Sequence, residues 1–421
     1  MNKVSIKNCA EILNISYLDS KPADSKLSEF FRGNKNLGSQ DRACIAELFY
    51  GVIRNKVYLE RVAGSKDSHQ MILVYLIKIL RKSIREILHL ITDKDELFLK
   101  NIKSMKLSQS VHPVKLSLPG WLWTKLVAEM GEKKTFDLAS NMLSPANLNV
   151  RVNALMNKSI NVVIEELRLS FPDISKDISE TILSPIGISL PRGTSIQKHP
   201  LFLNGNIEVQ DEGSQILSYL VSPDRGQMVA DFCAGAGGKS LALSSLMKNT
   251  GRIYAFDVSE KRLANLKKRL KRSGASNITM QRISNENDIK IKRLRGKFDR
   301  VLVDSPCTGL GTLRRNPDLK WKHNEKSLNE LISKQEAILN AASSLCKVGG
   351  YLVYATCSIL KDENENQVEN FVKNNNNFRV VPQSSIMSRY KITLGDGKFL
   401  KLNSLENNTD CFFGAVFERV E

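Results

Sequence analysis

Two cysteines and an aspartate follow predicted strands in the C-terminal half of the chain, and their side chains could do nucleophilic chemistry. One predicted strand runs into the sequence DSPC, which contains Asp304 and Cys307, and another runs into TCS, which contains Cys357. Because ligands bind at the carboxyl ends of strands in an open parallel sheet, we expect both thiols and Asp304 at one site. A single cysteine is more often a small buried hydrophobic residue, and Cys233 and Cys346 fit that description.

A glycine-rich loop earlier in the chain has the features of a site for a nucleotide-like cofactor. It reads DFCAGAGGKS over 231–240, between a strand predicted over 228–232 and a helix predicted over 241–247. Glycines let the backbone turn sharply and approach a ligand, and the start of a helix offers free N–H groups. Asp257 ends the next predicted strand about twenty residues after the glycines, where an acid can accept hydrogen bonds from ribose hydroxyls.

The spacing of this loop excludes two common nucleotide-binding motifs. A phosphate-binding P-loop would need a glycine where Cys233 stands. The GxGxxG pattern of dinucleotide sites is also missing, because Gly235, Gly237 and Gly238 read GxGG. A cofactor with an adenosine but no pyrophosphate fits better, and S-adenosylmethionine is the common one.

The composition favours a cytosolic, globular protein with a polyanionic partner. The 421 residues include 42% hydrophobic and 25% charged residues, which excludes a largely disordered or fibrous chain. No window is apolar enough for a membrane span, and the N-terminus shows no secretory signal or transit peptide. The formal net charge of +18 favours nucleic acid first and an anionic membrane surface second. The seven scattered cysteines form no CxxC pair and predict reduced thiols and no zinc site.

The periodicity of apolar residues predicts three domains. Residues 1–110 have apolar positions at helical spacing, as at Leu48 and Val52, and predict an all-helical lobe. Residues 111–204 combine a helix start at PGWL with the alternating segment NLNVRVN and predict a small α+β subdomain. From 205 to 421, strand-like runs alternate with helical stretches, which predicts an α/β domain with a doubly wound parallel sheet.

The motifs DFCAGAGGKS, DSPCTGLGTLRRNPDLKW and YATCSILKDENE resemble the RsmB/NOP family of RNA (cytosine-5) methyltransferases. The segments VQDEGSQ, PGWL, RVN and DCFFGAVFER are also similar to family elements, so the resemblance covers about residues 115–421. The first hundred residues, with SQDRACIAELFYGVIR, resemble the NusB-like extension of the branch that modifies 16S rRNA. The resemblance implies a Rossmann-like class I methyltransferase domain that uses S-adenosylmethionine, preceded by an RNA-binding subdomain and a NusB-like lobe.

The resemblance also assigns roles to the reactive side chains. Carbon 5 of cytosine is too poor a nucleophile to take a methyl group directly, so a thiolate must first add to carbon 6. By resemblance, Cys357 is this nucleophile, and Cys307 helps to remove the proton from carbon 5 after methyl transfer. Asp304 is expected to hydrogen-bond nitrogen 3 and the exocyclic amine of the base. The residues expected to bind the cofactor are Cys233, Ala234, Gly235, Ala236, Gly237, Gly238, Lys239, Asp257, Asn285 and Asp304.

Two segments depart from the family pattern. The loop has Gly235 and Ala236 where the commoner form has Ala-Pro, a change that keeps the backbone small and should preserve binding. The segment RISNEND should contain the residue at the adenine edge, and its alignment favours Ser284 or Asn285 over Asp288.

A basic segment marks where RNA is expected to lie. Residues 261–300 hold 14 Lys and Arg against 3 Asp and Glu, although a charge run of this kind is commonly a solvated face. Arg314, Arg315 and Asn316 are stronger candidates for RNA contacts, because they follow the Cys307 loop directly. The target base must be unpaired or flipped out for addition at carbon 6.

We therefore predict a monomeric RNA methyltransferase that forms 5-methylcytosine, with 16S rRNA as the leading substrate. Two alternatives stay open: a non-catalytic RNA-binding ribosome-assembly factor with the same fold, and a methyltransferase that acts on tRNA. A DNA cytosine-5 methyltransferase would place its nucleophile in the Pro-Cys motif and would need no Thr-Cys partner, so the presence of both Cys307 and Cys357 favours RNA.

Overall fold

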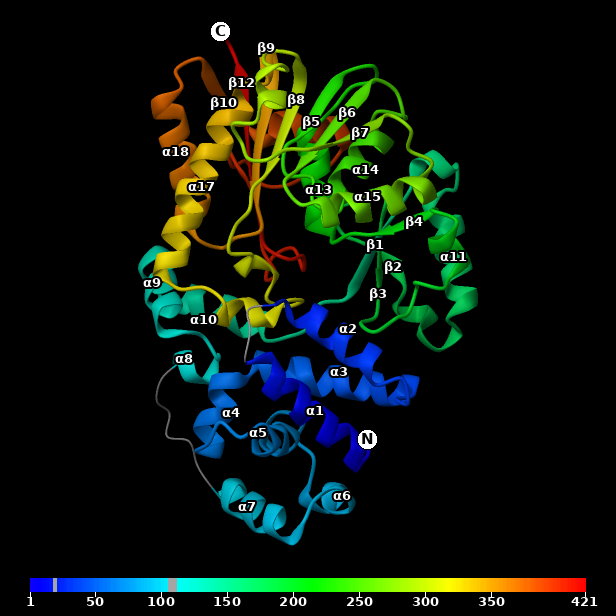
Figure 1. Ribbon diagram of the computed structural model, residues 1–421, viewed down its shortest axis with the longest axis vertical. Coiled ribbons are helices and arrows are strands. Elements are labelled where there is room, and N and C mark those ends of the chain that lie inside the picture. The colour runs from blue at the N-terminus through cyan, green and yellow to red at the C-terminus, as the bar shows by residue number, and fades with distance from the viewer. Residues whose placement is uncertain (18–20, 105–111) are drawn as a thin grey trace. The chain divides into compact units, whose positions relative to one another are not determined.

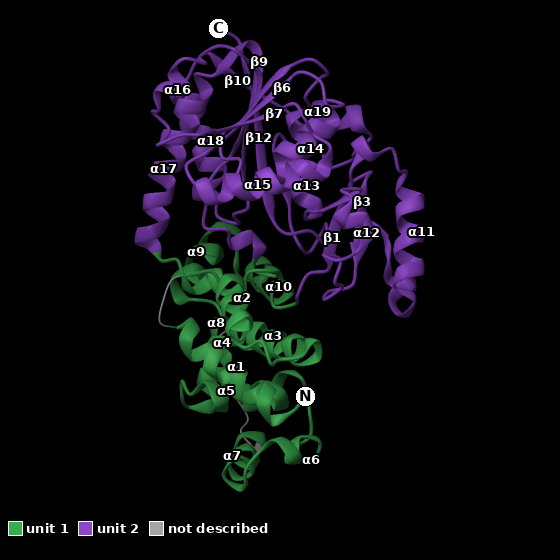
Figure 2. Ribbon diagram, turned by 45° about the vertical axis from the view of Figure 1, so that its right-hand side comes forward, with its two compact units in different colours: residues 1–144, 313–324 green, residues 145–312, 325–421 purple. Residues whose placement is uncertain are grey.

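The computed structural model describes residues 1–17, 21–104 and 112–421. These residues form two compact units, one of residues 1–144 and 313–324 and the other of residues 145–312 and 325–421 (Figure 2). This division differs from the three domains predicted from the sequence. Residues 112–144 group with the helical unit, and the small α+β part groups with the large sheet. The predicted boundary at 110/111 lies outside the described residues.

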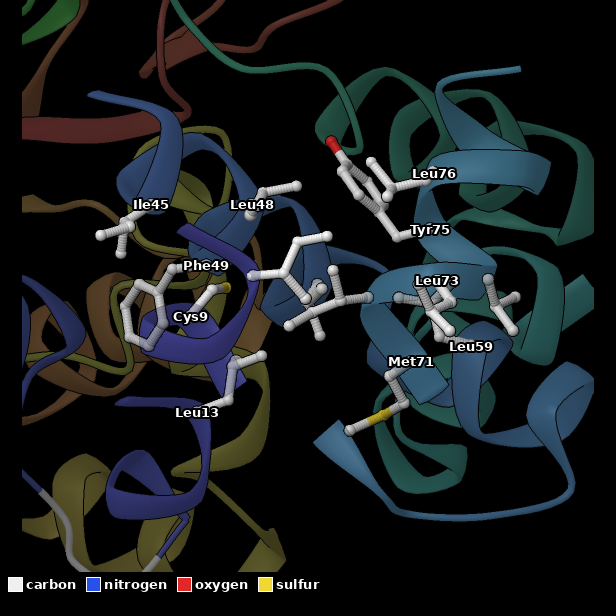
Figure 3. Close-up of a cluster of buried hydrophobic side chains, with 14 of the residues drawn as sticks. Cys9, Leu13, Ile45, Leu48, Phe49, Leu59, Met71, Leu73, Tyr75 and Leu76 are labelled. Atoms are coloured by element: carbon white, nitrogen blue, oxygen red, sulfur yellow. The ribbon is translucent and has the colours of Figure 1, made fainter. Parts of the chain in front are cut away.

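The first unit is built from helices, and the buried faces of those between residues 1 and 104 meet in one hydrophobic core (Figures 1 and 3). In helix α3, Ile45, Leu48, Phe49 and Val52 recur at helical spacing and are all buried, so this stripe packs inward. The helices are α1 (Lys3–Ser16), α2 (Ala23–Gly33), α3 (Ser39–Arg54), α4 (Lys56–Ala63), α5 (Ser68–Val74), α6 (Ile84–Ile87), α7 (Asp93–Ser104), α8 (His112–Lys115), α9 (Gly120–Met130) and α10 (Glu132–Met142).

A segment from the C-terminal half of the chain completes this unit by capping α3. The short helix η6 (Pro317–Trp321) brings Lys320 Nζ to the carbonyl oxygen of Arg54 at 2.8 Å and Trp321 Nε1 to that of Ile53 at 3.2 Å. Arg54 in turn donates from Nη2 to the carbonyl oxygen of Arg314 at 2.8 Å. The bonds from Lys320 and Trp321 satisfy carbonyls that the end of α3 leaves without intrahelical donors.

The second unit contains a small antiparallel sheet with strand order β2-β3-β1-β4. Val150 and Val152 of β1 pack with Ile188 of β3 and with Val163 and Leu167 of α11 in a separate small core. The elements of this part are β1 (Leu148–Val152), α11 (Ile160–Ser170), β2 (Ser179–Glu180), β3 (Gly187–Leu190), α12 (Pro200–Leu203) and β4 (Ile207–Val209).

The large sheet of this unit has the order β10-β12-β9-β8-β5-β6-β7, and β11 pairs with β12. Neighbours from β9 to β7 are parallel, whereas β12 runs antiparallel to β9 and β10. The strands are β5 (Met228–Asp231), β6 (Arg252–Asp257), β7 (Ile278–Arg282), β8 (Phe298–Asp304), β9 (Cys346–Thr356), β10 (Phe378–Val381), β11 (Leu400–Leu402) and β12 (Phe412–Arg419). Helix α13 (Glu212–Val221) precedes β5, and the helices between the strands are α14 (Gly238–Leu246), α15 (Glu260–Ser273), α16 (Ile289–Lys292), α17 (Glu325–Ser343), α18 (Glu365–Asn374) and α19 (Gln383–Met387).

Helices cover both faces of the large sheet (Figure 1). On β8, Val301 and Val303 pack in a core that includes α17 and α18, whereas Leu302 packs in the core that includes α13 and α14. This alternation is what a strand buried on both faces requires. The predicted doubly wound, Rossmann-like sheet is therefore confirmed. No helix among the described residues has the length and apolarity needed to cross a membrane.

Candidate active site

The site forms where the parallel strands of the large sheet end. Adjacent strands β6, β5, β8 and β9 end at Asp257, Asp231, Asp304 and Thr356. Because these strands run in the same direction, their carboxyl ends lie along one edge of the sheet. Three carboxylates and the thiol of Cys357, which follows β9, are thereby placed along that edge.

The glycine loop between β5 and α14 is held in a tight turn. Gly235 and Gly237 have φ values of 56° and 80°, and a Cβ atom on Gly237 would lie 2.1 Å from Cδ1 of Leu266. The Asp257 carboxylate accepts a hydrogen bond from the Gly235 N–H at 2.8 Å, which ties the loop to the end of β6. The sequence predicts that this turn requires glycine, and the requirement is strongest at Gly237.

A cavity of about 630 Å³ opens beside this loop. With the exception of Gly237, which shapes the turn, all of the predicted cofactor residues line it. The sequence interpretation missed several lining residues that follow β6 and β7 or lie on α17: Val258, Arg262, Ile283, Glu286, Lys334 and Ile338. For Val258, Ile283 and Glu286 the available signal was their position after a strand end, which indicates a region but no particular side chain, whereas Arg262, Lys334 and Ile338 lie on helices.

The polar residues of the segment after β7 have two different roles. Ser284 and Asn285 line the cavity. Asp288 instead accepts hydrogen bonds from the backbone N–H groups of Ser284 and Lys290, at 2.8 and 2.9 Å, and caps α16. This arrangement agrees with the sequence preference for Ser284 or Asn285 over Asp288.

Two carboxylates at the strand ends have distinct electrostatic surroundings. Lys239 Nζ donates to Asp304 Oδ2 at 2.7 Å, and although burial lowers the pKa of Lys239, the charge and hydrogen bond of Asp304 outweigh it and leave that pKa raised. Asp231 is fully buried, and its one hydrogen bond in the described structure comes from Ser240 Oγ at 2.6 Å. Burial raises the pKa of Asp231 to about 7.

The two predicted catalytic cysteines are brought together. The Sγ atoms of Cys307 and Cys357 lie 3.5 Å apart. The pKa of Cys307 is raised well above its usual value, first by its hydrogen bond to Cys357 and second by burial. The two thiols are thus in hydrogen-bond contact, and either sulfur can be the donor.

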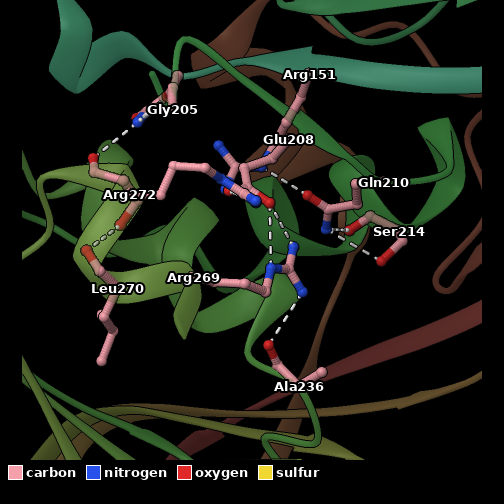
Figure 4. A network of polar contacts seen from close by, with 11 residues as sticks. Arg151, Gly205, Glu208, Gln210, Ser214, Ala236, Arg269, Leu270 and Arg272 are labelled. Atoms are coloured by element: carbon pink, nitrogen blue, oxygen red, sulfur yellow. Dashed lines mark hydrogen bonds and ion pairs between the residues drawn. The ribbon is translucent and has the colours of Figure 1, made fainter. Parts of the chain in front are cut away.

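A charged network contacts the glycine loop at Ala236 (Figure 4). Arg269 of α15 donates from Nη1 to the carbonyl oxygen of Ala236 at 3.0 Å, and its Nη2 bonds to Glu208 of β4 at 2.9 Å. Glu208 is buried and also accepts from Arg272 at 2.6 Å. The network therefore joins the small sheet, α15 and the cofactor loop.

The residues predicted to contact RNA lie in different places. Arg314, Arg315 and Asn316 belong to the helical unit, although Cys307 belongs to the other. Arg314 is only 9% exposed, whereas Arg315 is partly exposed and Asn316 is exposed. On α15, Lys267 and Lys268 are exposed to solvent.

The strand order, the glycine loop after β5 and the carboxylate at the end of β6 are the features of the S-adenosylmethionine-dependent methyltransferase fold. The cavity fits that cofactor because it combines backbone N–H groups, a buried carboxylate for ribose hydroxyls and apolar side chains for a ring. Residues 218–418 match the family model described as 16S rRNA methyltransferase RsmB/F. About half of the chain is therefore similar to this family of RNA methyltransferases, which agrees with the resemblance of its sequence motifs.

Individual relatives agree with this assignment. The chain is 32% identical to the probable ribosomal RNA small subunit methyltransferase B of Synechocystis over 63% of its own length and 58% of the relative. It is 26% identical to the probable protein of the same name from Bacillus subtilis over 92% of each chain. The crystal structure of the protein PH0851 is 25% identical, has a TM-score of 0.80 and covers 100% of this chain and 99% of its own. The first match therefore spans less than two thirds of that relative, and the second spans nearly the whole protein.

Proposed function

We propose that this protein methylates carbon 5 of a cytosine in 16S rRNA through a covalent adduct with Cys357. The observation that carries the proposal is the 3.5 Å separation of the Cys307 and Cys357 sulfur atoms after adjacent parallel strands, next to Asp304 and the cofactor cavity. One thiol alone would suit many roles. Two thiols in contact match a reaction that needs a nucleophile at carbon 6 and a base at carbon 5.

In the first step, the Cys357 thiolate adds to carbon 6, a carbon–sulfur bond forms and electron density moves to carbon 5. Asp304 hydrogen-bonds the polar edge of the base, and Lys239 holds the Asp304 carboxylate in place at 2.7 Å. When bound, S-adenosylmethionine supplies an electrophilic methyl group for carbon 5.

In the second step, the Cys307 thiol releases its proton to solvent, and the resulting thiolate accepts the proton from carbon 5. The carbon–sulfur bond to Cys357 then breaks as the ring double bond returns. The raised pKa of Cys307 has its largest cause in the hydrogen bond to Cys357. Once the Cys357 sulfur is bonded to carbon 6, it loses the negative charge that disfavours ionisation of Cys307. Cys307 then ionises more readily at the stage when a base is required.

The partner we propose is 16S rRNA, read as unpaired or flipped-out nucleotides by a monomeric, metal-free enzyme in the cytoplasm. The net charge of +18 supports an RNA partner. The names of the Synechocystis and Bacillus subtilis relatives support the small ribosomal subunit as its source. Arg314, Arg315 and Asn316 are proposed RNA contacts, and the exposed Asn316 and half-exposed Arg315 are placed best for it.

The test is bisulfite sequencing of total rRNA and tRNA from cells with and without the gene. We expect a single cytosine in 16S rRNA to lose its protection from conversion when the gene is absent. Loss of a protected tRNA site instead would keep the chemistry and overturn the substrate. If no site in either pool changes, the proposed reaction is wrong and the result favours the non-catalytic assembly factor.

A further inference from the structure

A buried glutamate that no step of the proposed reaction uses lies directly behind the two cysteines. Glu363 ends the short helix η7 (Lys361–Glu363) and is 0% exposed. Burying a carboxylate is costly unless hydrogen bonds compensate its lost hydration. The contacts that Glu363 makes therefore indicate why the fold retains it.

The Glu363 carboxylate joins the loop of Cys307 to the loop of Cys357. Thr308, which follows Cys307, donates to it from its backbone N–H at 2.8 Å and from its hydroxyl at 2.5 Å. Ser358, which follows Cys357, donates from its hydroxyl at 2.5 Å. Both residues next to the reactive thiols are thus fixed to one carboxylate.

Helix α17 and strand β9 hold Glu363 itself in place. Gln335 of α17 donates from Nε2 to Glu363 at 2.9 Å and to the carbonyl oxygen of Pro306 at 3.0 Å. Tyr354 of β9 donates its hydroxyl to the carbonyl oxygen of Glu363 at 2.7 Å. The carboxylate is consequently anchored to rigid elements on both sides of the site.

Asn364, the next residue, fixes the Cys357 turn from both ends. Its side-chain oxygen accepts from the Thr356 hydroxyl at 2.5 Å, and its side-chain nitrogen donates to the carbonyl oxygen of Ser358 at 3.1 Å. These two partners are the residues immediately before and after Cys357. Glu363 and Asn364 together therefore hold the loop of the nucleophile Cys357 and the loop of Cys307, an arrangement we call the clamp.

We propose that Glu363 is a positioning residue that sets the separation and orientation of the Cys307 and Cys357 thiols for the methylation reaction. The proposal rests on the proposed function, because it explains how the nucleophile Cys357 and the proton acceptor Cys307 are both held at one cytosine. A displacement of about 1 Å of a reacting group costs on the order of 100-fold in rate. The clamp holds the loops by short bonds to a carboxylate, which are stronger than bonds between neutral groups.

The test compares Glu363→Gln with the matched control Glu369→Gln, which removes an exposed carboxylate from α18. For Glu363→Gln we expect kcat for RNA methylation to fall by about 100-fold while KM for RNA and for S-adenosylmethionine stays within about 3-fold. The control should keep wild-type kcat. A purely structural role would lower the folded fraction, measured by near-ultraviolet circular dichroism, without a change in kcat per folded molecule.

A second readout does not depend on methylation. Diamide takes up the two thiol hydrogens and becomes a hydrazine as the Cys307 and Cys357 sulfurs form a disulfide, which needs about 2 Å between sulfur atoms. We expect this disulfide to form about tenfold more slowly in Glu363→Gln than in wild type, because thiol exchange depends on access and alignment. Cys307→Ala serves as the variant in which it cannot form.

If Glu363→Gln does not fold, Ser358→Ala and Thr308→Val test the same clamp by removing one hydroxyl donor each, and each should lower kcat and slow the disulfide. Unchanged kcat and disulfide rates in the folded variants overturn the positioning role. If wild type itself methylates no cytosine, the proposed function fails, and the disulfide rate still decides whether Glu363 positions the thiols.

Discussion

The sulfur atoms of Cys307 and Cys357 lie 3.5 Å apart although fifty residues separate them in the chain. Parallel pairing of β8 with β9 places Asp304 opposite Ala355, so the segments that follow both strands begin at the same level of the sheet. The backbone N–H of Gly311 then donates to the Cys357 carbonyl oxygen at 2.8 Å and closes the two loops on each other. Strand register and loop contacts together produce the thiol pair.

Replacing Gly237 by alanine should weaken cofactor binding and the fold together. The new Cβ would lie 2.1 Å from Leu266 Cδ1, in a backbone conformation with φ of 80° that side chains disfavour. We expect a loss of about 2 kcal/mol in stability and at least a tenfold weaker affinity for S-adenosylhomocysteine by calorimetry. Gly235→Ala is the matched control for backbone strain, because Gly235 also has a positive φ, of 56°, but its Cβ would meet no atom within 4 Å. Equal effects of both variants would contradict the steric argument.

Asp231→Asn should change how stability depends on pH. The pKa of Asp231 is about 7 when folded, against an ordinary value of 3.8. The folded state therefore binds a proton more tightly than the unfolded state, and its stabilisation is present below about pH 4 and is lost as pH rises through 7. The shift corresponds to at most about 4 kcal/mol. Thermal unfolding from pH 5 to 8 should show the variant gaining stability relative to wild type as pH rises, and parallel curves would count against this assignment.

Arg269→Met should weaken cofactor binding without touching the cofactor cavity directly. The variant loses the hydrogen bond to the Ala236 carbonyl oxygen. It also leaves the buried Glu208 carboxylate with fewer hydrogen bonds to compensate its lost hydration. We expect about a tenfold rise in Kd for S-adenosylhomocysteine, since a charged hydrogen bond contributes about 1.5–3 kcal/mol. Lys267→Met, on the exposed side of the same helix, should bind normally. Equal affinities of the two variants would show that the network does not support the loop.

The place of the candidate site in the fold could be predicted because its residues follow strand ends. Asp257, Asp304 and Cys357 each come directly after or at the end of an apolar strand, and the parallel sheet brings such positions to one edge. The glycine loop could be predicted equally well, because the turn at Gly237 has no room for a side chain. Local pattern and a general rule of topology were sufficient for these residues.

Contacts between distant segments could not be predicted in the same way. Arg314 follows the Cys307 loop in sequence, yet it is buried in the helical unit, because η6 caps α3 through Lys320 and Trp321. The clamp of Glu363 on Thr308 likewise depends on how two loops fifty-five residues apart pack. Neither packing leaves a periodic signal in the sequence.

The most direct test of the account traps the covalent intermediate. Cys357→Ala, Cys307→Ala and wild-type protein are incubated with a 16S rRNA transcript and S-adenosylmethionine, and protein–RNA adducts are separated on denaturing gels. We expect Cys307→Ala to accumulate an adduct that wild type resolves, and Cys357→Ala to form none. An adduct that survives in Cys357→Ala, or its absence from Cys307→Ala, would contradict the assignment of Cys357 as the nucleophile and Cys307 as the base.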